Sequence, residues 1–265
     1  MDVRSFSGKA FNQVPDSENR IHSDEVARAH GFEGALVPGV TVSAYLLHPA
    51  VVAWGRDFLD RGAAHVSVQK PVYDGRGFTV HVTPDGDAAY HAELLAGEVR
   101  CAVAASSLPA TATAPPVRRG DAPAGSVRVP ATREGMMRLR ESGMGAIRVP
   151  WGPGVPMAMY FRDEQEMPDL LRLGHGGFAN PAFLLGTTNW LVAANVALGP
   201  WLHLETWSQH YRAVPHGSAL IVEGRVTDLF EKKGHEFVDV DAGLFFEDGD
   251  PAAHVRLRAI YKLRP

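Results

Sequence analysis

One histidine, His22, stands in a setting suited to proton transfer. It comes just before a short predicted helix, for which Ser23 is the expected N-cap and Gly31 the expected end. A histidine at such a junction can reach over the next element, and its ordinary pKa of about 6.5 lets it give or take a proton at neutral pH. Asp16 and Asn19 precede it closely enough to orient its ring. The alternative is that His22 is an ordinary surface or helix-capping histidine, as most of the 12 histidines of the chain would be.

A second chemical feature is the segment from Gly34 to Val40, in which Pro38 and Gly39 begin a long apolar run. The first N–H groups of a helix have no intrahelical acceptor, and the helix dipole adds positive charge there. This helix start therefore suits a developing oxyanion. Gly39 has no side chain to hold a carbonyl group away. The alternative is that the Pro-Gly pair only begins the helix.

Two long apolar segments are predicted to be helices, Gly39 to Trp54 and Pro181 to Leu198. Both are apolar nearly all round, so each must be enclosed, as a curved antiparallel sheet would do. Strand patterns follow each helix, separated by Gly, Pro and Asp. The predicted strands cover residues 66–69, 78–82, 88–96 and 98–104 in the first half and 205–212, 219–227, 236–246 and 254–263 in the second.

The two halves share one spacing. The turn at Gly75 matches the turn at Gly217, and the helix start at Gly39 matches the one at Pro181, each pair being 142 residues apart. The order of helix and strands is also the same, which indicates a duplicated unit. The predicted fold class is α+β with a double hot-dog architecture, in which two curved antiparallel sheets each wrap a long helix. We expect the sheets to join edge to edge with both helices on the concave side.

The composition changes between residues 106 and 130 to Ala, Pro, Thr, Gly and Ser, which is typical of a linker. The predicted organisation is an N-terminal hot-dog unit over residues 1–108 that carries the motifs, a linker over 109–130, and a C-terminal unit over 131–265. The repeat places Glu164 at the position of His22, so the C-terminal unit is degenerate and expected to be structural.

A longer pattern surrounds His22 and Gly39. It consists of Asn19-Arg20-Ile21-His22, Asp24, Ala27, Gly31-Phe32, Gly34, Val37-Pro38-Gly39 and, further on, Lys70-Pro71-Val72-Tyr73-Asp74-Gly75. This pattern resembles the MaoC-like (R)-specific enoyl-CoA hydratases and dehydratases of the hot-dog superfamily. Their signature runs Asp-x-Asn-Pro-(Ile/Leu)-His, an acidic residue, an Ala-containing helix, Gly-Phe and an Ala-His-Gly that opens the central helix. The resemblance covers about residues 10–85.

The resemblance implies a lyase of fatty acid metabolism acting on a thioester of coenzyme A or acyl carrier protein. Such an enzyme adds water to an enoyl thioester or removes it from a 3-hydroxyacyl thioester. The resemblance makes His22 the catalytic histidine, Asn19 the motif asparagine, and Gly39 the residue whose N–H polarises the thioester carbonyl. Val37 and Pro38, beside Gly39, are the expected substrate-binding residues.

The sequence departs from the signature at the catalytic aspartate. That residue should lie five positions before the histidine, where this chain has Ser17. Either a one-residue bulge brings Asp16 into place, or Ser17 acts together with Glu18. Asp16 and Ser17 are therefore both candidate catalytic residues. Arg20 also replaces the motif proline, and Pro38 replaces the histidine of Ala-His-Gly.

Three other functions are alternatives to this prediction. A polyketide-type double hot-dog dehydratase would carry an aspartate on the second helix, where Leu184, Leu185 and Gly186 stand, so it is not expected. A hot-dog acyl-CoA thioesterase would use an acidic residue and the same helix start to direct water to the thioester carbonyl. A non-catalytic acyl-thioester-binding protein is favoured by Ser17 in place of the aspartate.

Composition limits the partners. The chain has 26 Lys and Arg against 30 Asp and Glu, a net charge of −4, so it lacks the basic surplus that nucleic acid binding needs. One cysteine, Cys101, excludes an internal disulfide, and the N-terminus lacks a signal-peptide pattern, so a cytoplasmic location is expected. No apolar stretch reaches the roughly 20 residues of a membrane span. No metal or redox cofactor is implied, because there is neither a ligand cluster nor a phosphate loop. A homodimer remains possible.

Overall fold

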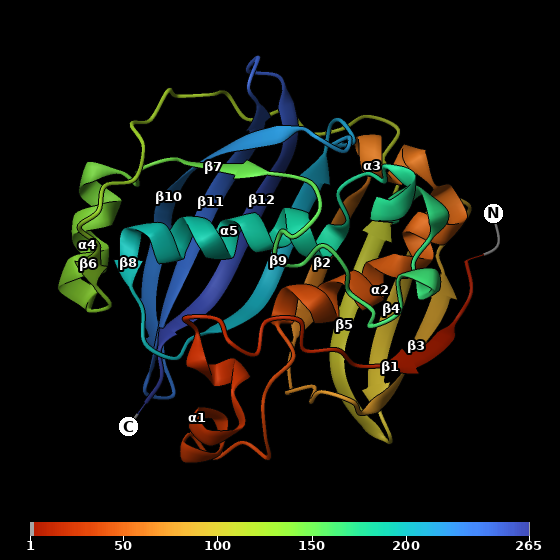
Figure 1. The fold of residues 1–265 in the computed structure, drawn as a ribbon, viewed down its shortest axis with the longest axis horizontal. Coiled ribbons are helices and arrows are strands. Elements are labelled where there is room, and N and C mark those ends of the chain that lie inside the picture. Colours follow the sequence, from red (N-terminus) through yellow and green to blue (C-terminus); the bar gives the residue numbers. More distant parts are fainter. Residues whose placement is uncertain (1–2, 265) are drawn as a thin grey trace.

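The computed structural model describes residues 3–264, within which ten strands form one antiparallel sheet (Figure 1). The first half supplies β1 (Phe6–Lys9), β2 (Ala63–Val68), β3 (Gly77–Pro84), β4 (Ala89–Ala96) and β5 (Val99–Ser107). The second half supplies β7 (Ile147–Pro150), β9 (Leu202–His210), β10 (Ala219–Lys232), β11 (His235–Phe246) and β12 (Pro251–Lys262). The strand order is β1-β3-β4-β5-β2-β9-β12-β11-β10-β7, so the antiparallel pair of β2 and β9 joins the two halves.

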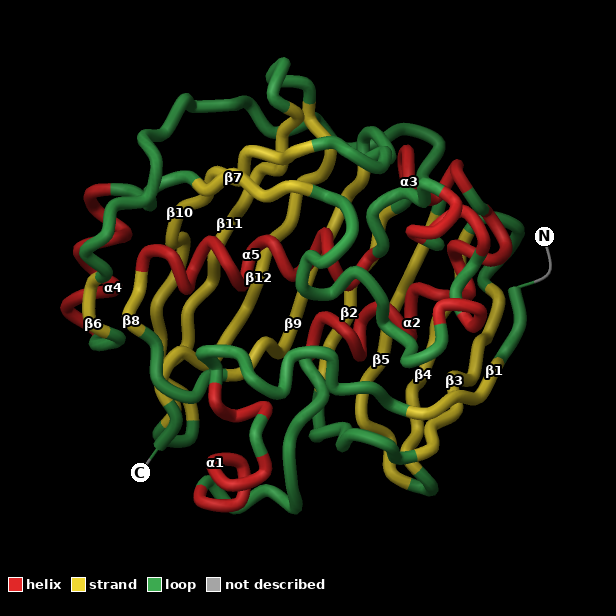
Figure 2. The backbone as a smooth tube through the Cα atoms, viewed as in Figure 1, coloured by secondary structure: helices red, strands yellow, loops and turns green. Residues whose placement is uncertain are grey.

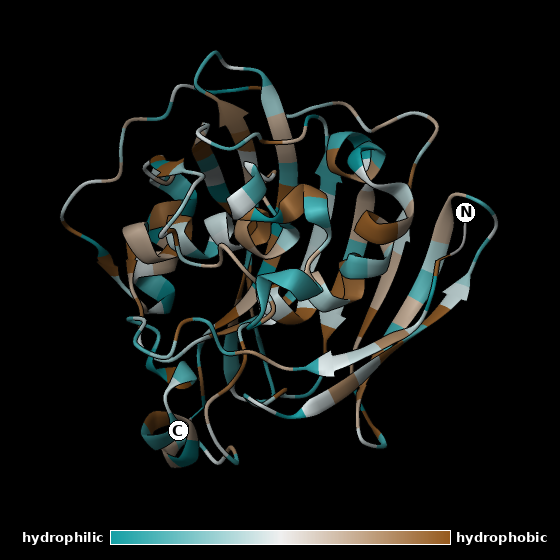
Figure 3. Ribbon diagram, turned by 45° about the vertical axis from the view of Figure 1, so that its right-hand side comes forward, coloured by the Kyte–Doolittle hydropathy of each residue, from teal (hydrophilic) through white to brown (hydrophobic). Residues whose placement is uncertain are grey.

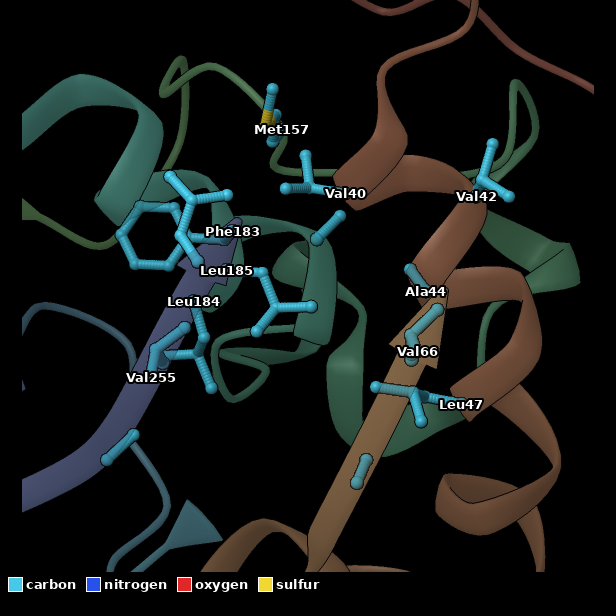
Figure 4. Packing of buried hydrophobic residues seen from close by; sticks show 14 of the residues in the cluster. Val40, Val42, Ala44, Leu47, Val66, Met157, Phe183, Leu184, Leu185 and Val255 are labelled. Carbon is cyan, nitrogen blue, oxygen red and sulfur yellow. The ribbon is translucent and has the colours of Figure 1, made fainter. Parts of the chain in front are cut away.

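Two long helices, α2 (Gly39–Trp54) and α5 (Pro181–Asn195), lie on the same face of this sheet (Figure 1). Helix α2 packs on β2, β4 and β5, helix α5 packs on β7, β10 and β12, and the two helices contact each other. Figure 3 shows hydrophobic residues along these helices and the strands around them. Figure 4 shows part of the shared core, including Val40 and Leu47 of α2 and Leu184 and Leu185 of α5.

The shorter elements lie around this centre. They are α1 (Asp24–Ala29), α3 (Arg56–Arg61), α4 (Arg133–Ser142), the short parallel pair β6 (Val129–Pro130) and β8 (Val196–Ala197), and the single turns η1 (Arg20–His22), η2 (Glu164–Glu166), η3 (Asp169–Leu171) and η4 (Leu173–His175). Figure 2 shows α1 and its flanking loops below the two long helices. None of the helices in residues 3–264 has both the length and the apolarity needed to cross a membrane.

The spacing found in the sequence recurs in the structure. Helix α5 begins at Pro181, 142 residues after α2 begins at Gly39, and β10 begins at Ala219, 142 residues after β3 begins at Gly77. The turns before these two strands both place a glycine at positive φ, 72° at Gly75 and 80° at Gly217, a conformation that favours glycine. The same local sequence requirements therefore produce the same turn and strand in each half.

Several boundaries differ from those predicted. Helix α5 ends at Asn195 rather than Leu198, because the chain leaves it to form β8. The strand β1 and the helix α4 were not predicted, since short elements carry weak sequence patterns. Part of the predicted linker is held against the sheet. The backbone N–H groups of Arg119, Gly120 and Asp121 donate to the buried carboxylate of Glu223.

The free energy of unfolding should fall as the pH is lowered from 6.5 to 4. Burial lowers the pKa of His48 to about 4, whereas the unfolded chain keeps the ordinary value of 6.5. Below pH 6.5 the unfolded state therefore binds a proton that the folded state does not, which costs about 3 kcal/mol by pH 4. Urea unfolding of the wild type and of His48→Phe measures this effect. The loss on acidification should be smaller in the variant, and an equal loss in both proteins would contradict it.

Candidate active site

A cavity of about 680 Å³ lies between the two halves of the molecule. Its wall includes five of the site residues predicted in the first half, namely Asn19, His22, Val37, Pro38 and Gly39. The second half contributes others, among them Asn189 of α5 and Trp201 and His203 on or next to β9. The second half was expected to be structural, and the structure corrects this, because both halves build the cavity.

His22 ends the turn η1, and its half-buried ring forms part of the cavity wall. Its Nδ1 lies 2.7 Å from the carbonyl oxygen of Leu36. A carbonyl oxygen can only accept, so Nδ1 carries the ring proton and Nε2 keeps its lone pair. Burial lowers the pKa of His22 below its ordinary value, and the hydrogen bond to Leu36 opposes this only in part. His22 is therefore neutral at pH 7, with a basic nitrogen at Nε2.

Asn19 fixes the loop that carries His22. Its Nδ2 donates to the backbone oxygen of Trp201 at 3.0 Å, and its Oδ1 accepts from the backbone nitrogen of Trp201 at 3.3 Å. The same Nδ2 lies 3.4 Å from Nε2 of His22. Asn12 holds the other side of this loop, since its Nδ2 donates to the backbone oxygen of His22 at 2.8 Å. The loop that carries His22 is thus anchored to the second half through Asn19.

Gly39 begins α2 at the cavity, after Pro38 turns the chain in extended geometry. No acceptor among residues 3–264 takes up the backbone N–H of Gly39. A Cβ atom at this position would lie 2.5 Å from the backbone oxygen of His203, closer than real Cβ contacts allow. Only glycine therefore lets the start of α2 lie directly on β9 with its N–H available. Val37 and Pro38 also line the cavity, as expected of substrate-binding residues.

Asp16 and Ser17 are not brought into the cavity wall. Asp16 is exposed, and no hydrogen bond or ion pair joins its side chain to any residue between 3 and 264. The Ser17 hydroxyl donates to the backbone oxygen of Asn19 at 3.2 Å, and Glu18 pairs with Arg128 at 2.8 Å. Neither of the two alternatives left by the sequence is found, since neither Asp16 nor the pair of Ser17 and Glu18 lies in the cavity wall with His22.

The cavity wall formed by the described residues contains no Asp or Glu. Its ionisable members are His22, His30, Lys70, His203, His235 and Arg264. Lys70 and Arg264 are exposed, so the positive charge lies where the cavity meets solvent. A chain with a net charge of −4 thus surrounds this one cavity with cationic and neutral groups, which suits an anionic ligand.

Sequence reasoning missed Asn189 and His203. His203 is buried, its Nδ1 lies 2.8 Å from Oδ1 of Asn189, and its Nε2 contacts the hydroxyl of Thr206. The signal in the sequence is a polar triplet, Thr187-Thr188-Asn189, inside an otherwise apolar helix. The hydroxyls of both threonines bond to backbone oxygens of their own helix, so only Asn189 was left to serve the cavity.

Comparison with known proteins shows likeness in structure but not in sequence. No family model matches the chain, and no curated protein sequence matches it. A hot-dog protein of unknown function from Alicyclobacillus acidocaldarius is similar over 100% of this chain and 95% of its own, with 14% identity and a TM-score of 0.53. The chain has the hot-dog fold.

Other solved structures are similar over most of this chain, among them a dehydratase domain and a tesB protein. The dehydratase domain of RzxB from Pseudomonas fluorescens matches 96% of this chain and 93% of its own, with 13% identity and a TM-score of 0.57. The tesB protein of Mycobacterium avium subsp. paratuberculosis matches 99% and 94%, with 12% identity and a TM-score of 0.54. At identities of 12–14% this structural likeness shows the shared fold alone, so function must be argued from the cavity.

For a reaction at this cavity that uses His22 as its base, the pH dependence should follow the ionisation of the His22 ring. A base must be neutral to take a proton, and burial holds the pKa of His22 below 6.5. We expect kcat/KM to be constant above pH 6.5 and to fall about tenfold per pH unit below the lowered pKa. A pH profile between 4.5 and 8.5 measures this. A midpoint above pH 6.5 would show that another group is the base.

Proposed function

We propose that this chain is an acyl-thioester hydratase or dehydratase, which interconverts enoyl and 3-hydroxyacyl thioesters by adding or removing water. The observation that carries the proposal is that the basic Nε2 of His22 and the available N–H of Gly39 belong to one cavity. The resemblance of residues 10–85 to MaoC-like hydratases supports the same chemistry. In that family the histidine and the helix-start glycine have these two roles.

The dehydration reaction can be written with His22 as the single acid and base. The Gly39 N–H donates to the thioester carbonyl oxygen, which makes the Cα–H bond more acidic. The His22 Nε2 takes that proton, the Cα=Cβ bond forms as the Cβ–O bond breaks, and the imidazolium returns the proton to the departing oxygen as water. His22 ends neutral, and hydration is the reverse. No carboxylate is required, which agrees with a wall free of Asp and Glu in the described chain.

The thioester is proposed to enter past Lys70 and Arg264. Both side chains are exposed at the cavity, and His30 and His235 lie beside it. Cationic groups in this position favour the phosphates that coenzyme A and the carrier-protein arm both contain. The apolar lining, which includes Val68, would then take the acyl chain.

The test is a product analysis of the purified chain with crotonyl-CoA, a longer trans-2-enoyl-CoA and a saturated acyl-CoA. The proposal expects loss of the enoyl absorbance, formation of the 3-hydroxyacyl-CoA and no release of free thiol. Release of coenzyme A from all three substrates would instead identify a thioesterase. Saturable binding without any product would identify a non-catalytic binding protein.

A thioesterase is the second candidate, because hydrolysis can use the same two groups of the cavity, the basic Nε2 of His22 and the available N–H of Gly39. Water addition at Cβ in the MaoC-like family uses both an aspartate and a histidine, and the structure does not bring Asp16 to His22. Hydrolysis needs one base to take a proton from water and return it to the leaving sulfur, which neutral His22 can do. The Gly39 N–H would then stabilise the tetrahedral oxyanion.

A further inference from the structure

The strand β9 and the helix α5 hold a chain of three hydrogen-bonded polar residues, Thr206, His203 and Asn189, of which His203 and Asn189 line the cavity. His203 and Thr206 are almost fully buried, whereas Asn189 is only partly buried and lines the cavity. Burial lowers the pKa of His203 to about 3, so its ring is neutral and carries one proton. Nothing in the acid-base steps proposed above uses these three residues.

The hydrogen bonds of this chain set the direction of the Asn189 amide. Its Oδ1 faces the His203 Nδ1 at 2.8 Å, so Nδ1 carries the proton and donates, and the His203 Nε2 accepts from the Thr206 hydroxyl. The amide Nδ2 then points away from His203 with two protons to donate. Among residues 3–264, no protein atom accepts from this Nδ2.

The other amides of the cavity wall do not offer such a donor. The Asn19 Nδ2 already donates to the backbone oxygen of Trp201. Gln69 is exposed, so water satisfies its amide. Asn189 therefore presents a donor to the cavity that no described protein atom accepts from, and its bond to His203 fixes the orientation of this donor before a ligand binds.

His203 also connects Asn189 to Gly39. The backbone oxygen and Cβ of His203 would lie 2.5 and 3.2 Å from a Cβ at Gly39, so the start of α2 rests on this residue. The His203 side chain then reaches Asn189. One residue thus supports, through its backbone, the N–H of Gly39 and, through its ring, the amide of Asn189.

We propose that the Asn189 Nδ2 is the second hydrogen-bond donor to the thioester carbonyl oxygen, beside the Gly39 N–H, and that His203 is the positioning residue that aims it. Each half of the chain then supplies one donor to the same oxygen. This inference rests on the proposed thioester site, but it does not depend on whether the carbonyl becomes an enolate or a tetrahedral intermediate. Both carry the developing negative charge on that oxygen.

The first experiment measures carbonyl polarisation without turnover. A saturated acyl-CoA labelled with ¹³C at the thioester carbon is bound to the His22→Ala background, which lacks the base, and its carbonyl stretch is recorded by infrared difference spectroscopy. In the His22→Ala protein, which is the parent of the variants below, we expect the stretch of the bound ligand to lie at lower frequency than that of the free ligand. Asn189→Leu and Asn189→Asp should both lose much of that shift, since neither side chain can donate there. Asp keeps the shape of Asn and its acceptor for His203.

The second experiment measures the energetic effect in the protein that retains His22. Exchange of the α-protons of the saturated acyl-CoA in D₂O should slow about 100-fold in Asn189→Leu, as is typical for loss of one oxyanion donor. Gln165→Leu, the same loss of an amide at an exposed position outside the cavity, is the matched control and should exchange at the wild-type rate. Far-UV circular dichroism checks that each variant is folded.

The role of His203 is tested by conservative rescue. In His203→Asn the amide nitrogen stands near the former Nδ1 and can still donate to Asn189, whereas His203→Leu cannot. The asparagine variant should keep more of the carbonyl shift than the leucine variant. If His203→Leu fails to fold, His203→Asn compared with the parent protein still answers the question. A carbonyl shift that is fully retained in a folded His203→Leu, or that is equally reduced in folded His203→Asn and His203→Leu, would overturn the positioning role.

The outcomes separate this inference from the proposed function. A carbonyl shift that is unchanged in both Asn189 variants overturns the inference, even if the wild type hydrates enoyl-CoA normally. A shift that depends on Asn189 supports it, even if the wild type proves to be a thioesterase or a binding protein. If the labelled thioester does not bind at all, both the inference and the proposed function fail.

Discussion

Replacing His22 by alanine should lower kcat/KM for hydration of an enoyl-CoA by about 100-fold to 10,000-fold, the usual contribution of one general acid or base. The expected loss is large because the described cavity wall offers no carboxylate that could replace the Nε2 of His22. The fold should survive, since the ring is only half-buried. Steady-state kinetics and a thermal unfolding curve measure the two effects. A loss below tenfold in a folded variant would show that His22 is not the acid or base.

Asp16→Asn is the matched control for this substitution. The side chain of Asp16 is exposed and outside the cavity, so removing its charge should change kcat/KM by less than about twofold. The sequence pattern made Asp16 a candidate catalytic residue beside Ser17. In that role the loss of its charge would be as damaging as the loss of His22. The two variants therefore separate the structure-based mechanism from the motif-based one. A large loss in Asp16→Asn would restore the aspartate.

Gly39→Ala should lower kcat by about 100-fold to 1,000-fold, because the helix start must move. A methyl group there would meet the backbone oxygen of His203 at 2.5 Å, and a backbone atom of a central strand cannot easily withdraw. The shift of α2 removes the Gly39 N–H from the thioester oxygen. It should also destabilise the fold by about 1–3 kcal/mol, as overpacking commonly does. Kinetics and urea unfolding of the same protein preparation measure both effects.

Gly125→Ala is the control for Gly39→Ala. A Cβ at Gly125 would have no atom within 4 Å, and the φ of Gly125 is not positive, so alanine fits without strain. Its kcat should equal that of the wild type, and its free energy of unfolding should match the wild-type value to within about 0.5 kcal/mol. Wild-type activity in Gly39→Ala would mean that the start of α2 does not bind the reacting carbonyl.

The sequence predicted the central helices and the strand repeats because these carry strong periodic signals. Helix α2 has the predicted bounds, Gly39 to Trp54, since a proline precedes it and a glycine, Gly55, with positive φ follows it. The 142-residue spacing depends on turns whose glycines are required by backbone geometry. The position of His22 beside the start of α2 also follows from local pattern, since only 16 residues, which form α1 and its flanking loops, separate His22 from Gly39.

The part of the cavity wall that comes from the second half of the chain could not be predicted, because it depends on contacts between residues far apart in the sequence. Asn189 and His203 become part of the cavity wall only because β2 pairs with β9 and brings the second half against Gly39. The same is true of Asn19, whose partner Trp201 lies 182 residues away. The error over Asp16 has a similar origin, because these distant bonds decide which residues of the loop face the cavity.

The most direct test of the central claim is a crystal structure of the His22→Ala variant with a bound 3-hydroxyacyl-CoA. We predict that the thioester carbonyl oxygen lies within about 3.2 Å of the Gly39 nitrogen, inside the cavity that both halves form. The phosphates should lie toward Lys70 and Arg264. A second cavity against β2, β9 and β12, lined in part by His65 and Trp207, is the alternative location. A thioester bound there, or a carbonyl away from Gly39, would contradict the account.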